Sequence, residues 1–296
     1  MNRLFMLLRV IRPHIVIGGA LGYLVGVFYP SINSRIDTRI TVLGYLTMLF
    51  IDLSTHYSND LYDVDRDRQA NWKPFGSKNV LIKTPDMSSW IYRTAVLCSL
   101  LSLSFAVLLV TRYNISSSLL VLTIIGNILG WSYSHPSVHL KAKGLGETAI
   151  ALGTGFIIPA IGYIVTNGTL SRDFLLFVAP MVLYGFILSI FLEIPDLEVD
   201  KRNQINNLTV RFGYHPMMMT CLILSLLNTV YYLSGTIPFI NRFWISLASL
   251  FPFAGCLIGV VRKTDSRSNT ELNTFLAISG LFAFLIGLNI ILVYLV

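Results

Sequence analysis

Long apolar runs separated by short polar segments dominate this chain. A helix that spans a bilayer needs roughly 20 apolar residues. On that scale the pattern predicts nine membrane-spanning helices, over 14–30, 40–61, 89–111, 115–134, 147–166, 173–195, 216–236, 242–261 and 273–295. These ranges take up most of the chain and leave no room for a separate soluble domain. We therefore expect an all-α fold in which residues 1–296 form a single domain, one bundle of transmembrane helices.

The composition agrees with a membrane protein. Hydrophobic residues make up 54% of the chain, charged residues 12%, and the mean hydropathy is +0.67, whereas a soluble domain is about 25% charged. Cys98, Cys221 and Cys256 all fall inside predicted spans, which argues against a disulfide framework or a cysteine metal site. Arginines interrupt the N-terminal stretch "MNRLFMLLRVIRPH", so we expect no removable signal peptide.

The positive charges predict the orientation in the membrane. Most of the 22 Lys and Arg residues lie at the N-terminus or in the loops after the second, fourth, sixth and eighth predicted helices. Cytoplasmic loops carry the excess of Lys and Arg, so we expect a multi-pass protein of the cell membrane with these segments in the cytoplasm. The net charge of +7 is then a topology signal. Nucleic-acid binding would require a basic face on a soluble module, and the sequence contains no such module. No obligate protein partner is evident.

An unusual polar face marks the end of the second predicted helix, in "STHYSNDLYDVDRDRQ" (54–69). At 100° per residue, six polar side chains share an arc of about 100°, whereas Asp65 points elsewhere. The six are Asp52, His56, Asn59, Asp60, Asp63 and Asp67. A helix cap needs one side chain, and each ionisable group inside a bilayer costs roughly 2.5–3.5 kcal/mol. A face of this length therefore indicates function.

The sixth predicted helix ends in a similar way, with Glu193, Asp196 and Asp200 on one face. Both acidic ends lie on the same predicted side of the membrane and can face each other across the bundle. Because carboxylates repel, a cation is expected between them. Oxygen ligands favour a hard ion, and Mg²⁺ fits best if it also binds a substrate phosphate. For His56, a hydrogen bond to Asp52 or Asp60 is favoured over binding to the metal. Whether His56 and Asp52 contact the metal stays open.

Basic residues surround the two acidic ends. Each alone fits the topology rule, but as a group they suit a diphosphate. They are Arg66, Arg68, Lys73, Lys78, Lys141, Lys143, Lys201 and Arg202.

Three stretches resemble the UbiA superfamily of intramembrane prenyltransferases. "NDLYDVDRD" (59–67) fits its NDxxDxxxD pattern, "DLEVD" (196–200) its second DxxxD, and "YSHPSVHLKAKGLGE" (133–147) its Tyr-x-x-Pro…Lys…Gly stretch. "GSKNVLI" (76–82) and "GLGE" look most like the branch of 1,4-dihydroxy-2-naphthoate polyprenyltransferases of menaquinone synthesis. Gln204, Ile205 and Asn207 depart from that branch, so the acceptor stays open.

The resemblance implies a central cavity, open laterally to lipid, that holds Mg²⁺ and a prenyl diphosphate. The implied metal ligands are Asn59, Asp63, Asp67, Asp196 and Asp200. Asp63, Asp196 and Lys141 would act in catalysis, and the substrate-binding residues would be Asn59, Arg66, Lys73, Tyr133, Lys201 and Arg12. For Tyr133 the alternative is bundle packing, and for Arg12 it is a snorkelling interfacial arginine.

The expected activity is Mg²⁺-dependent transfer of a polyprenyl group from its diphosphate to a lipophilic or aromatic acceptor, a quinone precursor, within the membrane. The alternative acceptor is a glyceryl phosphate of ether-lipid synthesis. A cation- or proton-coupled transporter is the alternative from another class, disfavoured because the acidic residues cluster at one end of the bundle. Chain length and oligomeric state stay open.

Overall fold

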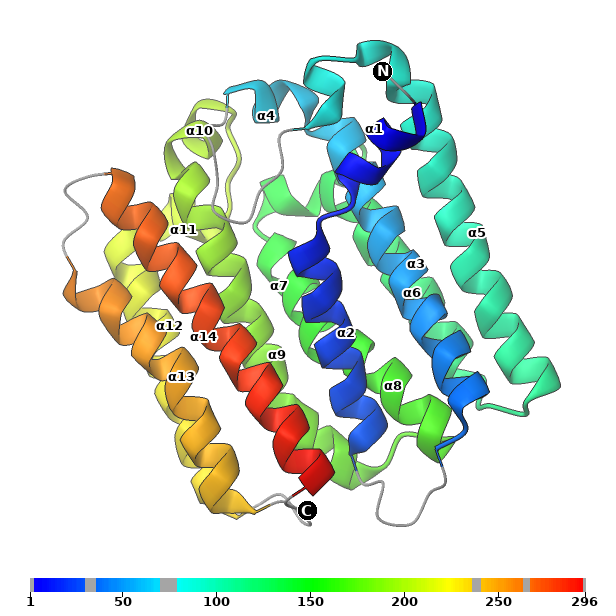
Figure 1. The fold of residues 1–296 in the computed structure, drawn as a ribbon. Coiled ribbons are helices and arrows are strands. Elements are labelled where there is room, and N and C mark those ends of the chain that lie inside the picture. The colour runs from blue at the N-terminus through cyan, green and yellow to red at the C-terminus, as the bar shows by residue number, and fades with distance from the viewer. Residues whose placement is uncertain (1–2, 30–35, 70–78, 236–240, 263–266, 295–296) are drawn as a thin grey trace.

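The computed structural model describes residues 3–29, 36–69, 79–235, 241–262 and 267–294, and in these ranges the fold is helical without strands (Figure 1). The long helices are α2 (Pro13–Phe28), α3 (Thr38–Tyr62), α5 (Ser88–Arg112), α6 (Ser118–Ser134), α9 (Arg172–Glu193), α12 (Tyr214–Leu233), α13 (Arg242–Val261) and α14 (Arg267–Tyr294). Between α6 and α9 the chain forms α7 (Gly146–Leu152), the π-helical turn η4 (Gly153–Ile157) and α8 (Ile158–Asn167). Eight of the nine predicted ranges thus correspond to one long helix each. The ninth, 147–166, corresponds to α7, η4 and α8 in succession.

Six helical segments in the described part are long and apolar enough to cross a membrane, and this makes the protein a multi-pass membrane protein. They are Pro85–Arg112, Gly146–Asn167, Arg172–Arg202, Tyr214–Leu233, Arg242–Val261 and Thr270–Tyr294. The other three predicted spans do not meet this measure. With 16 and 17 residues, α2 and α6 are shorter, and α3 is too polar because its second half carries the acidic face.

Short helices flank the polar end of the bundle. They are α1 (Arg3–Val10), α4 (Val64–Gln69), α10 (Leu197–Arg202), α11 (Leu208–Phe212), and the 3₁₀ turns η1 (Val80–Ile82), η2 (Pro85–Met87), η3 (Leu140–Lys143) and η5 (Ile194–Asp196). In Figure 1, α4 and α10 lie at the same end of the molecule. Thus the two acidic segments follow α3 and α9 at one end of the bundle.

The packing of the helices brings the two halves of the chain together around one space. In the N-terminal half α3 packs on α5 and α6, and α2 packs on α8; in the C-terminal half α13 packs on α12 and α14. The halves join where α2 contacts α14 and where α7 and η4 contact α9 (Figure 1).

Glycines set the closest of these contacts. A Cβ at Gly26 would lie 1.8 Å from the Pro159 carbonyl oxygen, and one at Gly162 would lie 2.1 Å from that of Tyr23, so α2 and α8 touch through their backbones. At Gly155, in the π turn, a Cβ would lie 2.4 Å from the Cα of Val182 in α9. Such wide turns recur at functional sites, and here the turn lines the cavity described next.

Candidate functional site

A cavity of about 400 Å³ lies between α2, α3, α6, α7, η4, α8, α9 and α14. Its walls are apolar near α8 and α14, where Ile158, Ile161, Leu281 and Phe282 line it. Its polar lining is provided by residues near the ends of α3 and α9 and by the start of α2. An elongated apolar molecule with one strongly polar end would suit this division.

The two acidic helix ends meet at the polar end, and Arg66 of α4 joins them. Its Nε donates to Asp200 at 2.7 Å and its Nη2 donates to Asp196. A second link is formed by Gln69 and Asn203, whose side-chain amides exchange hydrogen bonds of 3.3 and 3.1 Å. The Arg66 side chain thus connects the two groups of carboxylates.

Arg66 is held by charge on several sides. Its Nη1 also lies 3.5 Å from Asp67 Oδ1 and 3.9 Å from Asp63 Oδ2, and its side chain is only 9% exposed. Burial disfavours the charged guanidinium, but Asp196 and Asp200 outweigh this and hold the pKa of Arg66 above its ordinary value. A buried cation with this many carboxylate partners orders both acidic motifs.

Lys141 provides a second cation at the same place. The 3₁₀ turn η3 carries it, between His139 and Gly144, which both have positive φ angles of 49° and 73°. Lys141 Nζ lies 3.0 Å from Asp63 Oδ2 and 5.8 Å from the centre of the Tyr133 ring. Burial raises the pKa of Asp63, but Lys141 and Arg66 outweigh it, and the net pKa lies below the ordinary value. Asp63 is thus held as a carboxylate.

Asp60 and Asp67 are fixed by other partners. Asp60 forms an ion pair of 2.9 Å with Arg12, the residue just before α2. The side-chain amide of Asn79 donates to the Asp60 carbonyl oxygen at 2.6 Å and to Asp67 Oδ2 at 3.0 Å. These bonds attach the start of α2 and the segment around η1 to the end of α3.

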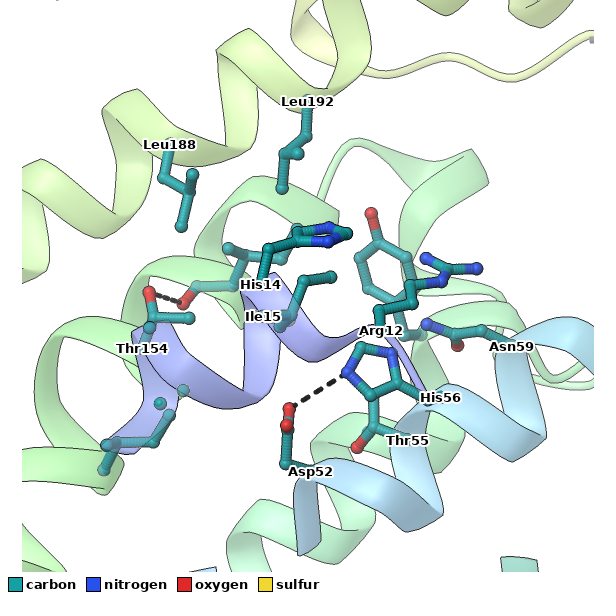
Figure 2. Close-up of a pocket in the computed structure, with 18 of the residues that line it drawn as sticks. Arg12, His14, Ile15, Asp52, Thr55, His56, Asn59, Thr154, Leu188 and Leu192 are labelled. Atoms are coloured by element: carbon teal, nitrogen blue, oxygen red, sulfur yellow. Dashed lines mark hydrogen bonds and ion pairs between the residues drawn. The ribbon is translucent and has the colours of Figure 1, made fainter. Parts of the chain in front are cut away.

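One and two helical turns further into the bundle, α3 presents His56 and Asp52 to the cavity (Figure 2). His56 Nε2 lies 3.4 Å from Asp52 Oδ1. The two side chains are thus neighbours, but the expected hydrogen bond from His56 is not formed in the described residues, and Asp60 pairs with Arg12.

Most of the predicted site residues line this one cavity. They are Arg12, Asn59, Asp63, Arg66, Asp67, Tyr133, Lys141 and Asp196. Asp200 lies behind them, fully buried, with its oxygens bonded to Arg66 and to Asn207. Lys201 is not brought into the site, because it is 47% exposed and pairs with Glu198. Lys73 lies outside the described residues.

Sequence reasoning missed several supporting residues. Asn207 donates to Asp200 at 3.0 Å, and Thr209 donates to Glu193 at 3.2 Å. Glu147, which is fully buried, accepts a hydrogen bond from the Leu208 backbone. These contacts hold the segment after α10 against Asp200, against Glu193 at the end of α9, and against Glu147 of α7. The sequence did single out Asn207, but only as a residue that differs from the branch of 1,4-dihydroxy-2-naphthoate polyprenyltransferases.

Comparison with known proteins decides the family. The model of the "UbiA prenyltransferase family" matches residues 17–289. This chain belongs to the UbiA prenyltransferase family. It is accordingly an enzyme, a prenyltransferase.

Two characterised relatives of this UbiA family member differ in their acceptors. It is 25% identical over 293 residues to the digeranylgeranylglyceryl phosphate synthase of Saccharolobus solfataricus, covering 95% of both chains. It is also 25% identical over 286 residues to the homogentisate phytyltransferase of Synechocystis, covering 89% of this chain and 87% of that one. These names leave the acceptor of this enzyme open.

Solved structures support the fold. A digeranylgeranylglyceryl phosphate synthase structure superposes with a TM-score of 0.69 at 16% identity, covering 99% of each chain. A UbiA homologue from Archaeoglobus fulgidus, bound to DMAPP and Mg²⁺, gives 0.69 at 20% identity over 94% of this chain and 98% of that chain.

The oxygen donors at the polar end are of the type that suits a magnesium ion. Asn59, Asp63, Asp67 and Asp196 offer oxygen ligands to the cavity, the type Mg²⁺ prefers. In the described residues Asn59 Oδ1 is buried without a hydrogen-bond partner, an oxygen that a ligand would satisfy. No three His, Cys, Asp or Glu side chains of that part are grouped closely enough to hold an ion. Arg66 and Lys141 contact these carboxylates instead.

Proposed function

We propose that this enzyme transfers a prenyl group from a prenyl diphosphate to a hydroxylated aromatic acceptor, a quinone precursor, in a Mg²⁺-dependent reaction inside the membrane. The observation that carries the proposal is the polar end of the cavity. There two carboxylate-bearing helix ends, Arg66 and Lys141 meet in a cavity whose walls near α8 and α14 are apolar. The solved homologue bound to DMAPP and Mg²⁺ supports this choice of donor and metal.

The residues at the polar end would hold the diphosphate. Asn59, Asp63, Asp67 and Asp196 would bind Mg²⁺, with Asp200 orienting Arg66 behind them. When bound, the ion neutralises the charge that develops on the diphosphate as the allylic C–O bond breaks. Arg66 and Lys141 carry N–H donors that can turn from the carboxylates to the diphosphate oxygens, where donors stabilise the same charge.

The rest of the cavity would take the prenyl chain and protect the reacting carbon. Its walls near α2, α8 and α14 are built from glycines and large apolar side chains, including Gly18, Gly22, Ile158 and Phe282. A dry, apolar space protects an allylic cation from capture by water. Tyr133 lines the same polar end, where the centre of its ring lies 5.8 Å from Lys141 Nζ.

A glyceryl phosphate is the second candidate acceptor. The match to the Saccharolobus synthase supports it, and Arg12 offers a donor, because its Nε is buried without a hydrogen-bond partner in the described residues. Against it, Arg12 is already paired with Asp60. The other Lys and Arg side chains that line the cavity within the described residues, Arg66 and Lys141, lie at the diphosphate end. Two phosphate-bearing substrates would compete for these three groups.

The experiment is an acceptor panel. Purified enzyme in lipid nanodiscs would receive Mg²⁺, radiolabelled geranylgeranyl diphosphate and, in separate reactions, hydroxylated naphthoates, hydroxylated benzenoids or a glyceryl phosphate ether. We expect a prenylated aromatic product. Product from the glyceryl phosphate alone would replace this proposal with the second candidate.

The proposed orientation places the N-terminus and both acidic motifs in the cytoplasm, following the distribution of Lys and Arg. Single cysteines introduced at exposed Asp65 and at Asp37, which caps the other end of α3, should react with a membrane-impermeant thiol reagent from opposite sides of inverted vesicles. The opposite pattern of labelling would reverse the orientation.

A further inference from the structure

The polar face of α3 continues past the metal and diphosphate residues. His56 and Asp52 line the cavity, and their side chains are 7% and 17% exposed. At 1.5 Å per residue, His56 lies roughly 10 Å and Asp52 roughly 16 Å along α3 from Asp63. With the diphosphate held as proposed, these two residues lie beside the prenyl part of the donor, and the chemistry at the polar end gives them no role.

These side chains carry hydrogen-bonding capacity that the described part of the protein does not use. Both ring nitrogens of His56 and Oδ2 of Asp52 are buried there without a hydrogen-bond partner. Buried polar groups in native proteins are nearly always paired, and leaving one unpaired costs about 1–3 kcal/mol. Unpaired groups that line a cavity therefore point to a polar ligand.

The contact between the two residues sets the chemistry of the imidazole. His56 Nε2 faces Asp52 Oδ1 at 3.4 Å (Figure 2). In the tautomer that carries its proton on Nε2, facing this carboxylate, the other nitrogen, Nδ1, keeps its lone pair. A distance of 3.4 Å is long for a hydrogen bond, but such contacts often shorten when substrate binds. This is the arrangement of a base and the group that orients it.

The surroundings favour a neutral polar group as the ligand. Figure 2 shows His56 between Asp52 and Asn59 on α3, with Arg12, His14 and Ile15 of the segment at the start of α2 across the cavity. Arg12 is committed to Asp60 by an ion pair of 2.9 Å. A hydroxyl group can donate to Nδ1 of His56 without bringing further charge into this part of the cavity.

We infer that His56 and Asp52 form the acceptor site, in which His56 binds the acceptor's hydroxyl group and takes up its proton. The inference rests on the proposed function. As the allylic C–O bond breaks, its electron pair leaves with the diphosphate. The ring carbon next to the hydroxyl forms the new C–C bond, and the O–H proton moves to His56 Nδ1. The diphosphate then takes the proton from that ring carbon, and His56 returns its own to the oxygen. Asp52 positions the imidazole and stabilises its charged form.

The test compares three variants with wild type in the aromatic transfer assay. His56→Ala removes the base, Asp52→Asn removes the orienting charge, and His215→Gln is the control because His215 is exposed at the start of α12. A positioned base contributes about 10²–10⁴-fold, so His56→Ala should lose transfer by that factor. Asp52→Asn should lose less, and His215→Gln nothing.

Further measurements separate this role from a structural one. Donor affinity of His56→Ala should equal that of wild type, and added imidazole should restore part of its transfer. The variant should still release prenyl alcohol from the donor, because ionisation depends on the diphosphate end. Transfer at the wild-type rate by His56→Ala, or a loss that imidazole does not restore, would overturn the inference. If wild type itself prenylates no aromatic acceptor, it is the proposed function that fails, and the acceptor site fails with it.

Discussion

Replacing Arg66 with methionine tests how the two acidic motifs are held together. Methionine keeps an unbranched side chain of similar length and removes the guanidinium. Arg66 Nε and Nη2 bind Asp200 and Asp196, whose side chains are 0% and 3% exposed. The substitution leaves two buried carboxylates without their cation, whereas the bond from Asn207 to Asp200 remains.

The expected loss follows from that geometry. Removing one partner of a buried ion pair costs about 3–5 kcal/mol. Taking up a proton limits the loss, because neutralising an ordinary aspartate at pH 7 costs about 4 kcal/mol. We therefore expect Arg66→Met to reduce the free energy of unfolding by about 3–5 kcal/mol in chelator. The deficit should shrink as the pH is lowered, since protonation removes the uncompensated charge.

The assay is thermal and denaturant unfolding of the purified protein in detergent, with EDTA and then with Mg²⁺ and a prenyl diphosphate. Arg68→Met is the matched control, because Arg68 is 60% exposed and its partner Asp65 is 91% exposed. Exposed pairs of this kind contribute about 0–1 kcal/mol. Equal stability of Arg66→Met and Arg68→Met in EDTA would refute the reasoning.

Three further substitutions test the donor end, the prenyl path and the helix packing. Lys141→Met should lower kcat/KM by about 10²–10³-fold, the usual effect of losing one donor to developing charge, whereas exposed Lys143→Met should not; equal rates would contradict the role of Lys141. Gly22→Leu should favour shorter prenyl donors in competition assays, because a Cβ there already lies 3.2 Å from Ile158; an unchanged preference would place the chain elsewhere. Gly26→Ala should lower the thermal midpoint sharply, because the added Cβ would overlap the Pro159 backbone. Gly153→Ala is the control, because a Cβ there would meet no atom within 4 Å. Similar midpoints for the two variants would contradict the packing of α2 on α8.

The helices could be predicted from the sequence because lipid-facing helices need long apolar runs, and these are visible without a structure. The polar face of α3 was visible for a similar reason, since residues on one helix follow a fixed angular period. Asp65 illustrates this: it was expected to point away and is 91% exposed. The π turn at Gly153–Ile157 was not predicted, because the contact of Gly155 with α9 is a tertiary feature.

Pairings between distant segments were harder to predict. The sequence placed Arg66 among residues that bind diphosphate, but its bonds to Asp196 and Asp200 depend on how α4 folds back over α10. Asn79 lies in a stretch that had been noted only for its family resemblance, and its bonds to Asp60 and Asp67 needed the fold. In the sequence, nothing distinguished Lys201 from its basic neighbours. In the structure it pairs with Glu198, three residues before it in α10.

Binding of a prenyl diphosphate tests the central claim most directly. Isothermal titration of the enzyme with geranylgeranyl diphosphate, with and without Mg²⁺, would be carried out on wild type, Asp63→Asn and Asp196→Asn. These two residues come from different helix ends and line one cavity. If the ends form one site, wild type binds the donor tightly only with Mg²⁺, and each substitution removes that dependence. Unchanged Mg²⁺-dependent binding by both variants would contradict the account.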